Sequence, residues 1–387
     1  MHGNQKGDYM ISLNLEQRCL IELIKASLFG VSPKIPENVN WEYLFVAAKK
    51  QCLVPMVTAS VPKDHRDEWI TLSARVKAYF MQMIYAQNSL VKLLTENSIP
   101  FIILKGTAAS IYYPTPLLRT FGDIDFYVAE EHVDQVINLL KNNGYVFVAN
   151  DDRHYEFEKY GIDFELHYRF SCKHYNDIED ILQKGLNDSV EYQINQNSFP
   201  GLPVCANGLV LLGHIMQHLK TSGIGLRQII DWMMFVNKEL DDYTWDNQFR
   251  AYAVEAGLDK LAITVTYMCK KWLGLSDKIT WCSNADDEVA DQLFIRVLDD
   301  GNLGNERTPW EIIRQAMRKE GVVSFLQHEG LKNWTWSQKC AVFRPFAWLY
   351  QIFRYICQGF ARLFTGKKIF RKDNTKMKLE ELWKRLE

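Results

Sequence analysis

The chain has 387 residues, of which 47% are apolar, so it can bury a large core and is not an intrinsically disordered protein. Its net charge of −2 excludes broad electrostatic binding of nucleic acid by the whole molecule. The 8 cysteines are scattered without a Cys-x-x-Cys pair, which predicts reduced thiols and a cytoplasmic protein. No apolar run is long enough to span a bilayer.

Residues 1–98 are predicted to form an N-terminal helical region. Apolar residues recur at helical spacing over 13–28, and Gly30 follows as a stop signal. The segments 41–50 and 74–97 repeat this apolar spacing. The first third of the chain therefore predicts helices packed through one face each.

Strands and helices alternate over residues 99–200, which predicts a compact α/β unit. In chain order the predicted elements are a strand at 101–104, a helix at 107–113, a strand at 123–128, a helix at 130–143, a strand at 145–149, and a hairpin of 154–158 with 162–170. Helices return in a C-terminal domain at 201–338, including 208–220 and 226–240. The predicted fold is α+β, with a small mixed-sheet core between N- and C-terminal helical domains.

A basic amphipathic tail is predicted at residues 339–387, where twelve Lys or Arg face four Asp or Glu. Within it, residues 343–364 have a wide apolar face opposite a narrow polar one that includes Gln351 and Arg354. Such a segment packs on the protein's own body, or it lies on an anionic membrane surface through residues 343–372. The second possibility predicts a membrane-peripheral protein.

The strand at 123–128 carries two aspartates, Asp123 and Asp125, which point to the same side because a strand alternates its side chains. Ile124 and Phe126 point to the other side, toward the core. Two neighbouring carboxylates repel each other unless a cation lies between them. The pattern therefore predicts a site for a hard metal, Mg²⁺ first and Mn²⁺ as the alternative.

A second acidic strand follows, with Asp163, Glu165 and His167 on one face. His167 is interpreted as an ordinary strand histidine whose hydrogen bonds are satisfied. If this strand lies beside the first, a third carboxylate joins Asp123 and Asp125. Three carboxylates around two metal ions can clamp the attacking and leaving oxygens of a phosphoryl displacement. The third acid would help to remove the proton of the acceptor hydroxyl, and the residues alone leave open whether it is Asp163 or Glu165.

The turn before this site suits a triphosphate. Gly106 lets backbone approach phosphate closely, and the helix that begins at Thr107 offers free N–H groups and a hydroxyl. Lys105 and Arg119 flank the loop and could neutralise the phosphate charge. Arg119 could instead form a structural ion pair with one of the aspartates.

At these residues the chain resembles the nucleotidyltransferase superfamily, and more narrowly its uncharacterised bacterial family. The matching segments are Leu104-Lys105-Gly106, Tyr113-Pro114, Arg119, Gly122-Asp123-Ile124-Asp125 and Glu165-Leu166-His167. The resemblance implies the fold and the use of a metal, and it places the third ligand at Glu165. Asp163 then stands at the rim, where it could bind ribose or the acceptor. Thr107 departs from the superfamily's usual serine but keeps the hydroxyl.

Three further residues of the C-terminal helices remain open. His214 and His218 have the spacing of zinc ligands, but packing near the site or bonding to backbone is the favoured interpretation. Arg227 could form a helix pair with Asp231. If the helical domain closes over the nucleotide, Arg227 could contact a phosphate or the base.

The sequence therefore predicts an Mg²⁺-dependent nucleotidyltransferase that binds a nucleoside triphosphate, such as ATP. It would transfer the monophosphate to a hydroxyl or phosphate of a sugar, protein, small molecule or RNA end. One alternative is a glycosyltransferase, which also uses Asp-x-Asp to hold a metal-bound nucleotide sugar. The other alternative is a module that binds nucleotide or a partner protein without catalysis.

Overall fold

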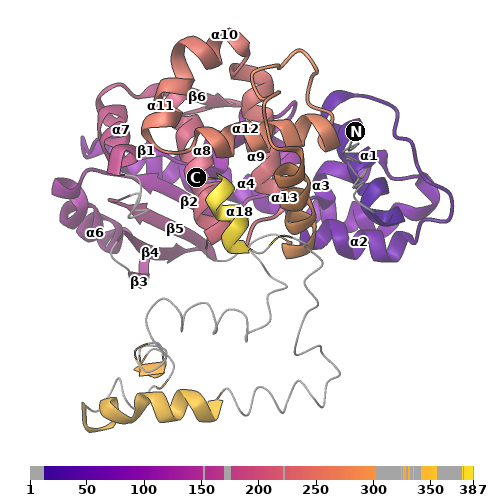
Figure 1. Cartoon of the computed structure of the whole chain (residues 1–387). Coiled ribbons are helices and arrows are strands. Elements are labelled where there is room, and N and C mark those ends of the chain that lie inside the picture. The colour runs from indigo at the N-terminus through magenta and orange to yellow at the C-terminus, as the bar shows by residue number, and fades with distance from the viewer. Residues whose placement is uncertain are drawn as a thin grey trace. The chain divides into compact units, whose positions relative to one another are not determined.

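We describe the protein from a computed structural model of the whole chain (Figure 1). The structure describes residues 13–150, 153–169, 176–220, 223–301 and 341–354, with shorter pieces at 324, 326–327, 330–331, 334, 377 and 379–386. The chain divides into two compact units, one formed by Met1–Leu303 with Lys376–Glu387 and the other by Gly304–Thr375. Every strand of the described residues belongs to the first unit.

The N-terminal part of the larger unit is helical, as the sequence predicts. Its elements are α1 (Leu15–Phe29), α2 (Trp41–Lys50), α3 (Val54–Val57), η1 (Thr58–Ser60), η2 (Lys63–His65) and the long α4 (Asp67–Glu96). α1 begins at a capping box, in which Asn14 and Gln17 each accept the other's backbone N–H. It ends at Gly30, whose φ of 67° confirms the predicted stop.

The centre of this unit is a mixed sheet in the order β1-β2-β5-β4-β3. Its strands are β1 (Ile102–Ile103), β2 (Asp123–Tyr127), β3 (Val146–Asn150), β4 (His154–Lys159) and β5 (Ile162–His167). β2 and β5 are parallel, and the other neighbouring pairs are antiparallel. The predicted α+β fold with a mixed sheet is confirmed.

Short helices connect these strands, and a second hairpin follows them. The elements are α5 (Gly106–Ser110), η3 (Pro116–Leu118), η4 (Glu130–His132), α6 (Val133–Asn142), α7 (Asn176–Asn187), β6 (Val190–Ile194) and β7 (Asn197–Gly201). The predicted hairpin of β4 and β5 is confirmed, and both turn residues, Tyr160 and Gly161, have positive φ. The β6–β7 hairpin was not predicted.

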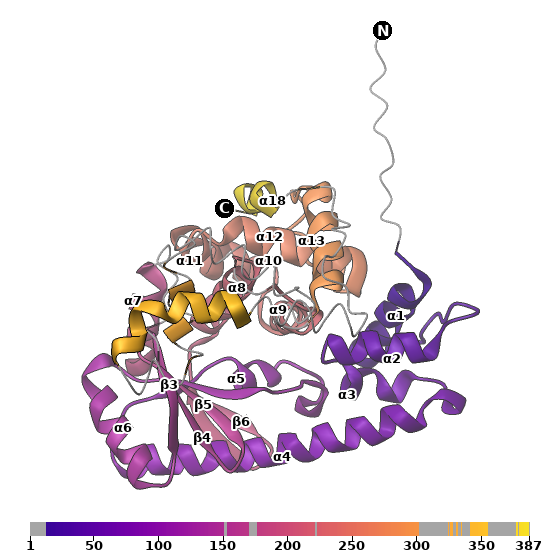
Figure 2. The same ribbon diagram turned by 90° about the horizontal axis from the view of Figure 1, so that it is seen from below.

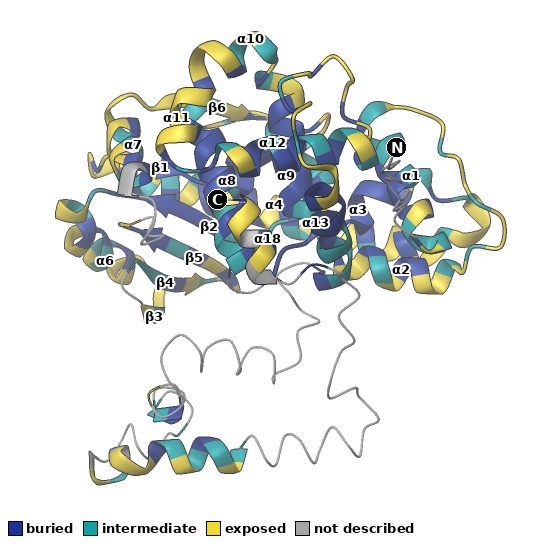
Figure 3. Ribbon diagram, in the orientation of Figure 1, coloured by how far each residue is buried: buried dark blue, intermediate teal, exposed yellow. Residues whose placement is uncertain are grey.

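The two faces of the sheet are buried under different helices (Figures 2 and 3). Ile124 and Phe126 of β2 pack in one core cluster with residues of α4 and α6. Tyr127, on the opposite face of β2, belongs to a second cluster that includes residues of α8 and α9. Asp123 and Asp125 share the face of Tyr127, so the acidic side chains lie on the side of the C-terminal helices.

The C-terminal part of the unit is again helical. Its elements are α8 (Val204–Lys220), α9 (Leu226–Glu239), α10 (Asp242–Thr244), η5 (Trp245–Phe249), α11 (Arg250–Glu255), α12 (Asp259–Met268), η6 (Cys269–Leu273), α13 (Asp287–Asp300) and α18 (Leu379–Leu386). α8 and α9 pack against each other, and α18 packs against α12 and α13. Since α9 is buried on nearly every side, it is a rigid wall beside the acidic face.

In the smaller unit the structure describes η8 (Ala341–Phe346) and the helical residues 347–354. The rest of the predicted amphipathic segment, 355–372, lies outside the described residues. Across the described part of the chain, none of the helices combines the length and the apolar character needed to span a membrane.

Candidate active site

The two acidic strands are neighbours in the sheet. β2 pairs with β5 in parallel, with Asp123 opposite Asp163, Asp125 opposite Glu165, and Tyr127 opposite His167. Residues at matched register on adjacent strands point to the same face. The predicted convergence of carboxylates from two strands is therefore present in the structure.

Three of these side chains are close enough to share one metal ion. The ligand atoms of Asp125, Glu165 and His167 all lie within 4.8 Å of one another. Nε2 of His167 is 2.8 Å from Oδ1 of Asp125 and 3.2 Å from Oε2 of Glu165. The sequence predicted Asp123, Asp125 and Glu165 as the metal ligands. The group found here contains His167, interpreted from sequence as an ordinary strand histidine, and not Asp123.

The carboxylates of this site differ in charge state. Repulsion by Asp125, together with burial and Glu165, raises the pKa of Asp123 to about 7. Burial alone would also raise the pKa of Asp125, but Lys105 and His167 hold it well below its ordinary range. The positive groups therefore balance Asp125 but leave Asp123 with excess negative charge beside it, which a divalent cation would balance.

We expect Asp123 to make the stability of the metal-free enzyme depend on pH. Its pKa of about 7 lies above its ordinary value of 3.8, so the folded chain keeps a proton that the unfolded chain releases between these values. The free energy of unfolding should therefore fall by about 1–3 kcal/mol as pH rises from about 4 to about 7.

Urea unfolding at several pH values in the presence of a chelator measures this effect. The difference between wild type and Asp123→Asn isolates it, because the asparagine does not titrate while the other groups are kept. A difference that stays constant across this range would contradict the placement of Asp123 beside Asp125 and Glu165.

The turn before α5 holds its three predicted residues differently from one another. Lys105 points at the carboxylates, and its Nζ lies 2.7 Å from Oδ1 of Asp125. Gly106 has a φ of 20°, and a Cβ at this position would contact the ring of Phe121 and the carbonyl of Asp123. Thr107 is buried, and its hydroxyl donates to Oε1 of Gln87 at 2.5 Å. A phosphate bond from Thr107 would thus come from its backbone N–H and not from its hydroxyl.

Arg119 is fully committed to a buried ion pair. Its Nε and Nη2 donate to Oδ1 and Oδ2 of Asp231 at 2.7 and 2.8 Å, and the Tyr113 hydroxyl donates to the same Oδ1 at 2.7 Å. The expected alternatives were a phosphate contact or a pair with Asp123 or Asp125. The structure shows a pair with a different aspartate, on α9, and the expected helix pair of Arg227 with Asp231 is replaced by it.

Arg227 and Asp163 stand at the edge of the site. Arg227 is half-buried, donates from Nη1 to the carbonyl of Thr120 at 3.2 Å, and its Nε has no hydrogen-bond partner among the described residues. The charge of Arg227 lowers the pKa of Asp123, although Asp125 and burial outweigh it. Asp163 is exposed and lies opposite Glu158 of β4, a position at the rim of the acidic face.

Two residues that contact the loops beside this site were not singled out from the sequence. The Tyr79 hydroxyl donates to the carbonyl of Gly122 at 3.4 Å, and burial, Asp163 and Asp123 raise its pKa. Gln87, as described, binds Thr107. Both belong to α4, and only the folding of that helix along the sheet brings them here.

His214 of α8 was expected to pack near the site, and burial, His218 and Lys105 hold its pKa well below the ordinary range.

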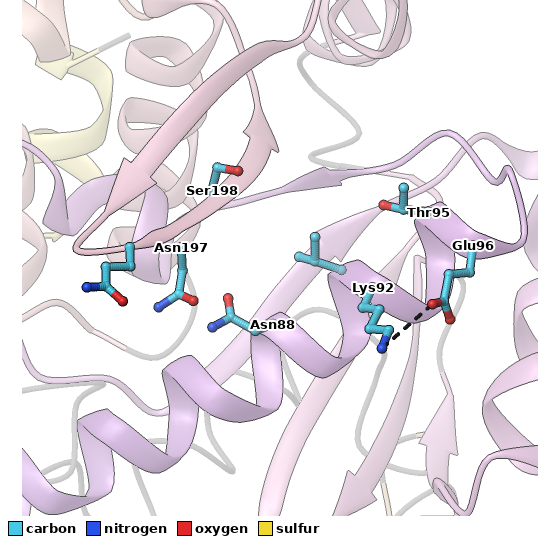
Figure 4. A pocket seen from close by; sticks show the side chains of 8 residues that line it. Asn88, Lys92, Thr95, Glu96, Asn197 and Ser198 are labelled. Carbon is cyan, nitrogen blue, oxygen red and sulfur yellow. Dashed lines mark ion pairs between the residues drawn. The ribbon is translucent and has the colours of Figure 1, made fainter.

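A separate surface pocket lies between α4 and the turn of β6 and β7 (Figure 4). Its polar lining includes Asn88, Lys92, Glu96 and Asn197, and Lys92 and Glu96 form an exposed ion pair at 3.7 Å. It contains none of the acidic strand residues. We therefore assign the candidate active site to the carboxylate face and not to this pocket.

Comparison with known proteins identifies the family of the chain. The sequence profile of a family described as uncharacterised nucleotidyltransferases matches residues 37–274, which is more than half of the chain and includes both acidic strands. The chain belongs to this nucleotidyltransferase family. No curated protein matches it. As a member of this family, the protein is an enzyme.

The similarities to solved structures are weaker. Two structures of ANT(2'')-Ia, one described as an antibiotic-resistance factor in solution and one as a complex with adenylyl-2"-tobramycin, are both 11% identical. They cover 45% of this nucleotidyltransferase and 92% and 98% of their own chains, with TM-scores of 0.35 and 0.33. A nucleotidyltransferase-like protein of Paracoccidioides brasiliensis is 14% identical over 51% of this chain and 94% of its own, with a TM-score of 0.31. Similarities this weak do not bear on its activity.

Proposed function

We propose that the enzyme transfers a nucleoside monophosphate from a nucleoside triphosphate to an acceptor hydroxyl or phosphate and releases pyrophosphate, with Mg²⁺ or Mn²⁺ as the cofactor. The observation that supports this most is the register of β2 and β5, which places Asp125 beside Glu165 and Asp123 beside Asp163. Carboxylates crowded in this way are costly without a cation. Family membership supports the reaction class, and the strand register supports the choice of site.

The residues fit a divalent cation. Asp125 and Glu165 offer oxygen ligands and His167 a nitrogen, all within 4.8 Å, and the raised pKa of Asp123 reflects unbalanced negative charge. Oxygen ligands suit Mg²⁺, while an imidazole ligand favours a softer metal, so Mn²⁺ deserves equal testing. When bound, the cation would stabilise the charge that builds up on the transferred phosphoryl group.

The protein side chains would share the remaining work. Glu165 is 26% exposed, compared with 3% for Asp125, so it can reach the acceptor hydroxyl and take its proton. Lys105 and Arg227 supply positive charge on the side of the helices, where the triphosphate would lie. The acceptor oxygen forms a bond to the α-phosphorus as the bond to the β-phosphate oxygen breaks, so orientation matters more than covalent chemistry.

A direct assay tests this reaction. The full-length protein is incubated with each of the four nucleoside triphosphates and with Mg²⁺ or Mn²⁺, and pyrophosphate release and label transfer to the protein or to added sugars, small molecules and RNA are followed. Consumption of a nucleoside triphosphate supports the proposal. Consumption of a nucleotide sugar instead would establish the glycosyltransferase, and tight nucleotide binding without any turnover would establish the non-catalytic module.

We also propose a peripheral contact with anionic membrane through the smaller unit. Val342, Phe346, Leu349 and Phe353 are 72%, 54%, 47% and 66% exposed, at a spacing that places the last three on one side of a helix. Gln351, predicted on the polar face, is buried instead. An exposed apolar side in a strongly basic tail suits an anionic lipid surface.

Co-sedimentation with lipid vesicles tests this contact. The wild type should bind vesicles that contain phosphatidylserine but not pure phosphatidylcholine, and salt should weaken the binding. The double variant Phe346→Glu with Phe353→Glu should bind at least about tenfold more weakly. It removes apolar area that would be buried in the membrane, and it adds negative charge that the anionic lipids repel. Tyr85→Glu on α4, an equally exposed position of the larger unit, is the matched control. Equal binding of all three proteins would exclude the contact.

A further inference from the structure

Lys105 has a backbone conformation that residues with a Cβ avoid. It stands before α5 with φ 44° and ψ −127°. Its side chain is only 12% exposed, so the position is not a solvent-exposed turn. Strain of this kind persists where the surroundings enforce it, and it collects at functional sites. Here the sheet enforces it, because Leu104 donates its N–H to the carbonyl of Asp125 at 2.9 Å.

The consequence is that the ammonium of Lys105 is delivered to one oxygen of Asp125. Its Nζ lies 2.7 Å from Oδ1, and the same oxygen is 2.8 Å from Nε2 of His167. Two nitrogen groups therefore surround one oxygen of a carboxylate that is 3% exposed. A metal ion that binds this oxygen must displace the ammonium or share the oxygen with it. Sharing is costly, because like charges at this distance repel strongly in a buried site.

We propose that Lys105 is the internal counter-ion of the metal site. Its ammonium neutralises the Asp125 carboxylate until the metal ion and the nucleotide bind together. This inference rests on the proposed function. A metal ion alone would place a new positive charge beside the ammonium, and both would compete for the negative charge of Asp123, Asp125 and Glu165. The triphosphate supplies that anion, so the ammonium moves from Asp125 to a phosphate oxygen as the metal takes its place. Metal and nucleotide then help each other to bind.

Manganese titration of the full-length protein separates this role from a structural one. Free Mn²⁺ is followed by its electron paramagnetic resonance signal, alone and with an ATP analogue whose α,β-bridge is methylene. We expect Lys105→Met to bind Mn²⁺ alone about tenfold more tightly than wild type and the Mn²⁺–nucleotide complex about tenfold more weakly. A residue that only supports the fold would weaken both when replaced.

Two variants provide the controls. Lys105→Arg keeps the positive charge and should not gain affinity for Mn²⁺ alone. Lys92→Met removes an exposed lysine of α4 and should change neither affinity. A second measurement does not depend on the folding of Lys105→Met. In Asp125→Asn the ammonium loses its carboxylate, so this variant should bind the analogue in the presence of a chelator several-fold more tightly than wild type.

The results distinguish this inference from the proposed function. If Lys105→Met binds Mn²⁺ no more tightly than wild type, or Asp125→Asn gains no affinity for the analogue, the counter-ion role is wrong even when the enzyme transfers nucleotides. If both affinities change as expected while no triphosphate is consumed, the counter-ion role holds and the transfer reaction is wrong.

Discussion

Replacing Asp125 with asparagine is expected to lower kcat for nucleotidyl transfer by about a thousandfold or more, while the fold is retained. Asp125 lies beside three other groups of the site. Its Oδ1 is bonded by Lys105 and His167, and its neighbour across the strands is Glu165. The asparagine keeps the shape of the side chain but removes the negative charge, so the cation and both nitrogen donors lose their common partner. Initial rates of pyrophosphate release measure the loss.

Asp163→Asn is the matched control for this experiment. It makes the same chemical change on the same face of the sheet, but the side chain of Asp163 is exposed at the rim. We expect a loss of less than about tenfold, since a solvent-exposed rim charge contributes little. If the two variants lose activity equally, or if Asp125→Asn stays active, the metal-binding role assigned to Asp125 is wrong. Thermal unfolding of both proteins excludes a trivial loss of structure.

The sequence predicted those parts of the site that follow from the alternation of side chains along a strand or from a local turn. Alternation along a strand placed Asp123 with Asp125, and Asp163, Glu165 and His167 together, before any strand pairing was known. The hairpin of β4 and β5 followed from Tyr160-Gly161, because adjacent positive φ values fit such a turn. These predictions depend only on neighbours in the chain, which explains why they agree with the structure.

Other features depend on contacts between distant segments, which no local period encodes. Arg119 pairs with Asp231, a residue 112 positions away, and Thr107 donates a hydrogen bond to Gln87 of α4. The sequence alone favoured an ordinary strand histidine at His167. Only its closeness to Asp125 and Glu165 in the folded chain shows that it could bind a metal ion with them. The β6–β7 hairpin was missed because its strands are short and rich in polar residues.

Replacing Arg119 with alanine is expected to destabilise the fold by about 3–5 kcal/mol in the absence of nucleotide. The pair with Asp231 is bidentate, and both side chains are nearly inaccessible at 7% and 4% exposure. Alanine would leave the Asp231 carboxylate buried with the Tyr113 hydroxyl as its remaining hydrogen-bond donor in the described structure. Urea unfolding of the apo-protein measures the effect, because no ligand contributes to it.

The exposed pair of Arg169 with Glu130 is the matched control. Nη2 of Arg169 donates to both carboxylate oxygens of Glu130, at 2.9 and 3.0 Å, but the two side chains are 51% and 61% exposed. Arg169→Ala should therefore change the free energy of unfolding far less than Arg119→Ala does. The double variant Arg119→Met with Asp231→Leu should recover most of the lost stability, since it removes the buried charge altogether. Suppose instead that Arg119→Ala leaves stability unchanged and lowers only the affinity for nucleoside triphosphate. The structural ion pair would then be secondary, and Arg119 would have to leave Asp231 to bind phosphate during the reaction.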